Sequence, residues 1–232
     1  SIAQAVHTNR TLQLNSGSTF ENIVGGSGDD VLTGNALNNS FTGNGGNDTL
    51  TGATGNDSLF GGLGDDIYVF GTASSAEADT VTEGTNQGND TLLFESLTTA
   101  VTLNLTKSIV QSVHTNRTLQ LNSGSAFENI VGGSGDDVLT GNALDNSFTG
   151  NAGNDTLTGA AGNDSLSGGL GDDTYIFGQA SSPEADSVAE GTDQGTDTLI
   201  FESLSSGVTL NLTMSVVQSV HTNRTLQLNS GG

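Results

Sequence analysis

Residues 25–69 read GGSGDDVLTGNALNNSFTGNGGNDTLTGATGNDSLFGGLGDDIYV, and the fold of this chain depends on them. The stretch divides without remainder into five units of nine residues, with glycines early, Asp or Asn at the sixth position and a large apolar residue at the eighth. The units occupy 25–33, 34–42, 43–51, 52–60 and 61–69, and the same five return at 132–176. Because the phase is kept through five consecutive units, twice, the pattern is a structural repeat.

Each unit combines a tight turn with a short strand. Glycines at positions one, two and four let the backbone take positive φ, so that carbonyl oxygens can converge on one point. The sixth residue adds a carboxylate there, and six to eight hard oxygen ligands are what Ca²⁺ selects, whereas zinc would need His or Cys. The eighth residue is expected to point inward, at Leu32, Phe41, Leu50, Leu59 and Tyr68.

Two units make one coil of eighteen residues, so alternate units are expected to stack on the same side. Asp30, Asp48 and Asp66 would then form one ladder, and Asn39 and Asp57 the other. Rungs lie about 4.8 Å apart, the strand spacing. Carboxylates at that distance repel by about 1 kcal/mol in water and by more when desolvated. A divalent cation between them reverses the sign, so folding is expected to be coupled to metal.

On these residues the chain resembles the RTX (haemolysin-type calcium-binding nonapeptide repeat) family, strongly over 25–70 and 132–177. The resemblance implies an all-β fold, a right-handed parallel β-roll or β-solenoid with calcium in the turns. It also implies that positions two, four and six of one turn meet positions one, three and six of the next turn on the same side. Carbonyl oxygens and Asp side chains would be the ligands.

The ligands expected from this resemblance fall into two matching sets. In the first block they are Gly26, Gly28, Asp30, Gly43, Asn44, Gly45, Gly46, Asp48, Gly52, Thr54, Gly55, Asp57, Gly61, Leu63 and Asp66. In the second block they are Gly133, Gly135, Asp137, Gly150, Asn151, Ala152, Gly153, Asp155, Gly159, Ala161, Gly162, Asp164, Gly168, Leu170 and Asp173.

Composition excludes several classes of protein. The chain has 232 residues, 26 acidic and 4 basic, with a net charge of −22. We expect no nucleic acid partner, because nothing here could neutralise phosphates. We expect no membrane insertion, since no apolar stretch approaches the length of a membrane helix. The absence of cysteine excludes disulfides and leaves calcium to stabilise the fold. A solenoid, which needs only a thin apolar stripe, suits the 5% aromatic content.

A longer repeat of 107 residues overlies the short one. SVHTNRTLQLNSG occupies 112–124 and 219–231, and AVHTNRTLQLNSG occupies 5–17. We therefore interpret 1–24 as the end of a preceding module. The first module is 25–131, with a repeat block at 25–70 and calcium-poor strands at 71–131. The second is 132–232, with a block at 132–177 and strands at 178–232 that end in the start of a third.

This organisation indicates a window cut from a longer tandem array, or one protomer of a polymer with a continuing repeat. A roll has open ends, and the two ends of this chain are the same module in phase. Head-to-tail continuation, within one chain or between chains, is the expected solution to the exposed edge strands.

The residues between the blocks also have strand character. Segments 78–84, 90–96, 100–106, 108–113, 117–123 and 126–131 are short, alternating and rich in β-branched residues. We expect them to continue the same parallel roll. Twelve strands per module would make about six coils, or roughly 29 Å of rise. The two modules would then superpose by translation along the axis with a small rotation.

Two weaker motifs leave alternatives open. The second unit has Asn39 in place of Asp, so it is either a metal site lacking one carboxylate or a plain turn with Leu37 packed inward. Beyond the blocks stand Asp79, Asp90, Asp186 and Asp197. These acids either close the last calcium site, as in families with such an ending, or cap ordinary turns.

The three histidines, His7, His114 and His221, recur in V-H-T-N-R without a partner base or nucleophile. We therefore expect no enzyme, but a calcium-binding structural segment of an extracellular or cell-surface bacterial fibre, stalk or surface layer. The family resemblance implies export in an unfolded state by a one-step (type I) secretion system, with folding on calcium outside. Two alternatives remain: an adhesin module with ligand contacts on outward rows such as Thr33, Thr42 and Thr51, or the non-catalytic tail of an exported enzyme.

Overall fold

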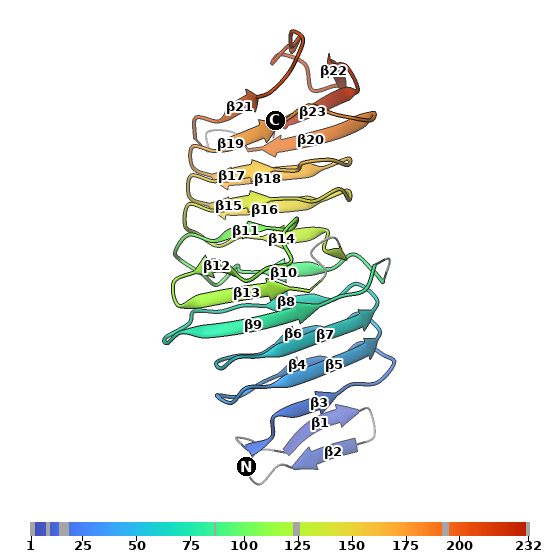
Figure 1. Cartoon of the computed structure of the whole chain (residues 1–232), viewed down its shortest axis with the longest axis vertical. Helices are drawn as coiled ribbons and strands as arrows, with labels where there is room; N and C mark the ends of the chain where they lie inside the picture. Colours follow the sequence, from blue (N-terminus) through green and yellow to red (C-terminus); the bar gives the residue numbers. More distant parts are fainter. Residues whose placement is uncertain are drawn as a thin grey trace.

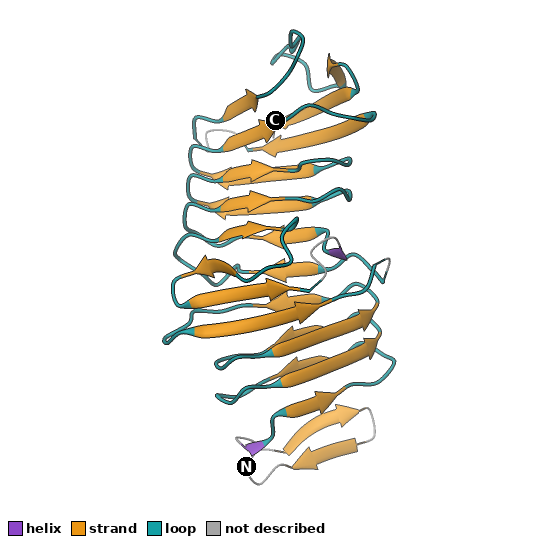
Figure 2. Cartoon of the chain, in the orientation of Figure 1, coloured by secondary structure: helices purple, strands orange, loops and turns teal. Residues whose placement is uncertain are grey.

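The computed structural model describes the backbone of residues 3–7, 10–13, 19–85, 87–122, 126–191 and 195–230. Over these residues the chain is an elongated all-β roll, with strands stacked across its long axis (Figure 1). The only helical positions described are single 3₁₀ residues at Thr19 and Ala126, and everything else is strand, turn or loop (Figure 2). The expected all-β class and parallel β-roll are confirmed.

Four sheets build the roll. A two-stranded sheet holds β1 (Ala3–His7) and β2 (Arg10–Gln13). The ten-stranded sheet runs in the order β22 (Gln218–His221), β23 (Arg224–Ser230), β20 (Glu184–Glu190), β18 (Ser165–Leu170), β16 (Ser147–Ala152), β14 (Asn129–Val131), β10 (Thr91–Leu93), β8 (Ile67–Val69), β6 (Thr49–Thr51), β4 (Val31–Thr33).

The other two sheets are shorter. One runs in the order β12 (Gln111–His114), β13 (Arg117–Leu121), β9 (Glu77–Thr82), β7 (Ser58–Leu63), β5 (Ser40–Gly45), β3 (Asn22–Val24). The other runs in the order β11 (Thr102–Asn104), β15 (Val138–Thr140), β17 (Thr156–Thr158), β19 (Thr174–Phe177), β21 (Thr198–Phe201).

The eighteen-residue coil is confirmed by the register of the parallel strands. Leu32 pairs with Leu50 between β4 and β6, while Phe41 pairs with Leu59 between β5 and β7. Alternate nonapeptides therefore stack on the same face. The eighth residues are all buried and form one continuous apolar core through the roll, because successive side chains of a strand point to opposite faces.

The segments between the blocks follow the parallel roll only in part. Strands β9, β10, β11 and β14 overlap predicted segments and pair in parallel. The segment 117–123 also continues the roll, since β13 pairs in parallel with β9. The prediction for 108–113 was wrong in topology, since β12 folds back on β13 as an antiparallel hairpin. Its two-residue turn is closed by Asn116 at φ 62°, a conformation that Asn tolerates. The hairpin recurs at β22–β23 and β1–β2; residues 8–9, 14–18 and 123–125 lie outside the described part.

The hairpin also overturns the predicted relation between modules. Strand β4 lies in the ten-stranded sheet, yet β15, which is its equivalent 107 residues later, lies in the five-stranded sheet. The modules are therefore related by a half-coil turn, and a small rotation cannot superpose them. Only β6, β8 and β10 separate β4 from β14, and β15, the equivalent of β4, follows β14 by half a coil. The rise per module is therefore about 22 Å at ~4.8 Å per coil, less than expected. A hairpin consumes residues without adding a rung to each face.

Candidate metal centres

The turn of each nonapeptide is shaped by its sixth residue, which folds back over the first. At Gly43 an added Cβ would lie 1.9 Å from Oδ2 of Asp48 and 2.6 Å from the carbonyl oxygen of Gly61. Gly46, the fourth residue of the same unit, has φ 102°, which L side chains rarely adopt. The glycines of the pattern therefore make room for a carboxylate and for the next turn of the roll.

The sixth-position side chains form ladders, as the sequence predicts. Oδ1 of Asp48 accepts a hydrogen bond from the backbone N–H of Asp30 at 2.8 Å, and Oδ1 of Asp66 accepts one from the N–H of Asp48 at 2.7 Å. In the second block the N–H of Asp137 donates to Asp155, and the N–H of Asp155 to Asp173. One oxygen of each carboxylate thus fixes the side chain in the turn.

At most rungs of the ladders, and at Asp90, the second carboxylate oxygen is buried and has no hydrogen-bond partner among the described residues. This holds for Oδ2 of Asp48, Asp57, Asp66, Asp90, Asp155 and Asp173. A buried carboxylate oxygen without a partner is costly unless a cation satisfies it. The donor set around it consists of carboxylate and carbonyl oxygens, which fits a hard divalent cation such as Ca²⁺.

Burial also disturbs the protonation of the ladder. Desolvation raises the pKa of Asp66 to about 6, and that of Asp155 and Asp164 to about 7. Neighbouring carboxylates on the same ladder raise these pKa values further. A bound cation would favour the ionised form and reverse the shift.

The structure brings together the turns that were expected to share ions. Turn 25–30 lies on turn 43–48, where the N–H of Gly25 donates to the carbonyl of Thr42. Turn 43–48 in turn lies on 61–66, with Asn44 beside Gly62 and Gly45 beside Leu63. The second block repeats this arrangement, with Asn151 beside Gly169 and Ala152 beside Leu170. Which individual carbonyls bind the ion stays a prediction.

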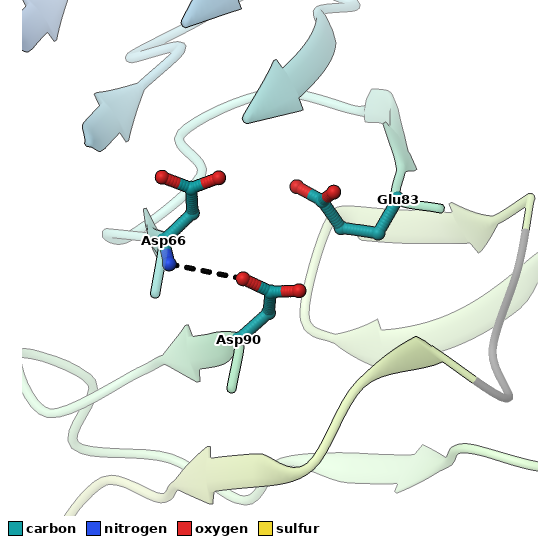
Figure 3. A group of neighbouring side chains, drawn as sticks. All are labelled: Asp66, Glu83 and Asp90. Atoms are coloured by element: carbon teal, nitrogen blue, oxygen red, sulfur yellow. Dashed lines mark hydrogen bonds between the residues drawn. The ribbon is translucent and has the colours of Figure 1, made fainter. Parts of the chain in front are cut away.

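The last rung of the first block holds three buried carboxylates, Asp66, Glu83 and Asp90 (Figure 3). One oxygen from each lies within 4.8 Å of the others. The N–H of Asp66 donates to Oδ1 of Asp90 at 2.9 Å. Tyr68 donates its hydroxyl hydrogen to Oε1 of Glu83, while Oε2 of Glu83 has no partner among the described residues. Asp90 is therefore placed where the hypothesis of a closing acid needs it.

Glu83 is a residue that the sequence reasoning missed. It directly follows β9, and because Phe60 pairs with Thr82, it occupies the rung position next to Gly61. Desolvation, with the charges of Asp90 and Asp66, raises the pKa of Glu83 to about 8. The second block has the same group, Asp173, Glu190 and Asp197, less buried. The available signal was the Glu-Gly pair after the strand in both modules, at 83–84 and 190–191.

Asp79 and Asp186 have a different environment from Asp90 and Asp197. Oδ1 of Asp79 continues the second ladder by accepting the N–H of Asp57 at 3.0 Å, but its Oδ2 pairs with Arg117. The same guanidinium binds Oε2 of Glu77 at 2.7 Å and lies 5.5 Å from the centroid of the Phe70 ring. In the second module Arg224 binds Asp186 and Glu184 in the same way. At these two ladder ends the positive charge is therefore supplied by an arginine side chain of the protein.

A second row of side chains stabilises the outer edge of the turns. Oδ1 of Asp29 accepts the N–H of Asn47 at 2.8 Å, and Oδ1 of Asn47 accepts the N–H of Asp65 at 3.0 Å. These are fifth-position residues, and the sequence analysis left them unassigned. The signal was present, because every unit of the first block has Asp or Asn at this position.

The degenerate second unit uses amide hydrogen bonds. Nδ2 of Asn39 donates to the carbonyls of Phe20 and Glu21, and its Oδ1 accepts the N–H of Asn35. This favours the plain turn over a metal site. The expected inward packing of Leu37 was wrong, since that side chain is exposed.

The comparison with known families agrees with this geometry. A family model described as the RTX calcium-binding nonapeptide repeat matches four stretches, residues 16–50, 33–68, 123–143 and 140–175. These are RTX calcium-binding nonapeptide repeats. The ligand of such repeats is Ca²⁺, so the expected cofactor is confirmed. No curated protein matches the chain. Among its described residues there is no helix with the length and apolar character needed to cross a bilayer.

Proposed function

We propose that this chain is a structural segment of an extracellular or cell-surface bacterial fibre, stalk or surface layer, made rigid by calcium after secretion. The observation that carries the proposal is the row of buried Oδ2 atoms on the ladders, such as those of Asp48, Asp66 and Asp90. Each would repel its neighbour at neutral pH in the absence of a cation, so at that pH the roll is stable only when calcium is bound.

The location follows from the calcium requirement. Extracellular calcium modules have dissociation constants of about 10⁻⁴–10⁻³ M, far above cytosolic calcium levels. A chain with sites of that strength would stay extended inside the cell and fold outside. A net charge of −22 adds to the self-repulsion of the calcium-free chain.

A structural role suits the shape of the molecule better than catalysis. The conserved geometry between the two modules lies in the turns and the core stripe, both of which serve the stacking of coils. His114 and His221 contact a hydroxyl, of Thr99 and Ser206 respectively, and their Nδ1 atoms face backbone carbonyls. Among the residues that the structure describes, no carboxylate hydrogen-bonds either ring to orient it as a general base.

Circular dichroism and calorimetry on the chain test the proposal together. In excess chelator at neutral pH we expect the spectrum of an unfolded chain, and on addition of millimolar calcium a β spectrum with several ions bound. Magnesium serves as the control and should fail, because it demands a smaller octahedral shell. A chelated chain that keeps its β spectrum would refute the coupling of folding to calcium.

A further inference from the structure

One six-residue sequence of this chain has two different structures. VTLNLT occurs at 101–106 and again at 208–213. The first copy contains strand β11, which lies in the five-stranded sheet beside β15. The second copy contains no strand. Since the sequences are identical, the difference comes from what lies next to them.

The side chains of the two copies differ in the same sense. Leu105 is fully buried, at 0% exposure, whereas its equivalent Leu212 is 75% exposed. Val101 is buried, and its equivalent Val208 is exposed. Around the second copy lies an apolar cavity of about 630 Å³ whose lining includes Leu199, Phe201, Leu210, Leu212, Met214 and Leu228. We call this surface the C-terminal face.

The equivalent face of the first module is covered by the segment FENIVGGSGDDVLT, residues 127–140. Ile130 pairs with Leu92 between β14 and β10, and Leu139 pairs with Leu103 between β15 and β11. The ring of Phe127 lies edge-on to Tyr68 with centroids 6.0 Å apart. The N–H of Asp90 donates to Oε2 of Glu128 at 2.9 Å. Residues 127–140 are thus held on this face by backbone pairing, by apolar contacts and by a hydrogen bond to a carboxylate.

The same fourteen residues stand at 20–33, at the opposite end of the roll. There Phe20 is 53% exposed, whereas its equivalent Phe127 is 0% exposed. Ile23 is only partly buried, whereas its equivalent Ile130 is fully buried. The chain therefore carries an apolar face at one end and, at the other, the sequence that fits it.

We infer that the C-terminal face binds residues 20–33 of a second copy of this chain, so that molecules join head to tail. β3 of the incoming copy adds to the edge of β21, as β14 adds to β10 within the chain. Phe20 then covers Tyr175, and Glu21 receives the N–H of Asp197. Hairpin β22–β23 already occupies the place beside β20, so the matching hairpin of the incoming copy, β1–β2, lies outside the joint.

This inference rests on the proposed calcium-dependent fold, and calcium has a direct part in the joint. The group Asp173, Glu190 and Asp197 is partly exposed at the C-terminal face, whereas its equivalent Asp66, Glu83 and Asp90 is fully buried beneath the second module. Docking would bury the second group as the first is buried. Calcium in that group would offset the repulsion that arises when Glu21 approaches it, since both copies are strongly acidic.

Sedimentation equilibrium in millimolar calcium, over a range of chain concentrations, tests the joint. The parent chain should form species larger than the monomer that grow with concentration. Leu212→Gln blocks the C-terminal face and Phe20→Gln blocks the incoming segment, so each variant alone should sediment as a monomer. Ile109→Gln, at an exposed apolar residue between β11 and β12, is the matched control and should associate like the parent.

Mixing the two blocked variants gives the sharpest result. The Leu212→Gln chain keeps a competent segment 20–33, and the Phe20→Gln chain keeps a competent face, so the mixture should form a species of twice the chain mass and nothing larger. A parent chain that folds in calcium but stays monomeric overturns the inference. So does association that survives both substitutions, or that is also lost in Ile109→Gln. Dichroism on each sample reports calcium-dependent folding separately, so failure of the proposed function is distinguishable from failure of the joint.

Discussion

The two ladders of the first module end in different ways. The ladder Asp30, Asp48, Asp66 ends at Asp90 and Glu83, a group of buried carboxylates with unpartnered oxygens. The ladder that runs through Asp57 ends at Asp79, whose Oδ2 is paired with Arg117. The carboxylates at the first end need a cation from solution. Those at the second end are neutralised by the guanidinium of Arg117, which belongs to the chain itself.

This difference shows which parts of the carboxylate ladders depend on calcium. The next rung after Asp79 presents Leu119 at the ladder position, and Arg117, two residues earlier, directs its guanidinium to Asp79. A guanidinium is always charged and gives several directed donors, so it satisfies two carboxylates without calcium. The Arg117 end marks the boundary of the calcium-dependent ladder, and the Asp90 end carries the ladder to Glu128, shortly before the second block.

The largest effect is expected from Arg117→Gln. It leaves Glu77 and Asp79 buried without a counter-ion, and breaking a buried ion pair costs about 3–5 kcal/mol. Chemical unfolding in saturating calcium should show that loss. The control is the triple variant Glu77→Gln, Asp79→Asn, Arg117→Gln, which removes the charges together and should regain most of it. Equal stability of Arg117→Gln and the parent would contradict the role of the Arg117 guanidinium.

Next in size is the difference between Asp48→Ala and Asp30→Ala. Asp48 belongs to two stacked turns and its Oδ1 accepts the N–H of Asp30, whereas Asp30 begins its ladder and is partly exposed. Asp48→Ala should abolish two calcium sites and Asp30→Ala one. Asp48→Ala also leaves a backbone N–H without its partner, at a cost of about 1–3 kcal/mol. Isothermal titration calorimetry measures the number of calcium ions that each variant binds. Equal numbers for the two variants would argue against shared ions.

The stability of the calcium-free chain should depend on pH through the carboxylates at the Asp90 end of the ladder. The folded-state pKa values of Asp66, Asp90 and Glu83 are raised to about 6, 7 and 8, whereas unfolded carboxyls titrate near 4. The folded chain therefore binds more protons in that window. Without calcium its free energy of unfolding should be greatest near pH 4 and fall as pH rises toward 8.

Dichroism against pH in chelator measures this effect. We expect β signal near pH 4 to 5 and its loss at neutral pH. Adding calcium should reverse the trend, because calcium binds the ionised carboxylates and competes with protons. A calcium-free chain that gains β structure on going from pH 5 to pH 8 would show that desolvation is not the dominant cause.

The smallest effect is expected from Glu83→Gln. It removes one of three charges from the buried group, and affinity follows the number of charged ligands, so the weakening should be about tenfold at that site. Glu190→Gln is the comparison, and it should weaken its site less because solvent screens the half-buried group. Tyr68→Phe, which keeps all three carboxylates, is the control. Calcium titration of all three variants ranks them, and a larger loss in Tyr68→Phe than in Glu83→Gln would contradict the assignment.

The local part of the structure could be predicted from the residues alone. The spacing of nine predicted the coil of eighteen, the inward Leu and Phe residues, the ladders and calcium as ligand. All of these follow from contacts inside one turn or between turns eighteen residues apart, as between Asp48 and Asp66. A repeat with constant phase carries that information in every unit.

The structure where the repeat ends depends on contacts between residues that are far apart in the sequence. Arg117 meets Asp79 across 38 positions of the sequence, and Glu83 meets Asp66 across the gap between two faces of the roll. The nonapeptide spacing does not encode these approaches, so Asp79 and Asp90 looked alike in the sequence. The hairpin β12–β13 and the exchange of faces between modules were missed for the same reason.

The two copies of VTLNLT show why these features could not be predicted from the sequence. A strand is stabilised by the neighbour that pairs with it and by the side chains that cover it, and neither is written in its own residues. The copy beside β15 is a buried strand, and the identical copy at 208–213 is not. Sequence specified which residues can form the roll, and the neighbouring coil decided which of them do.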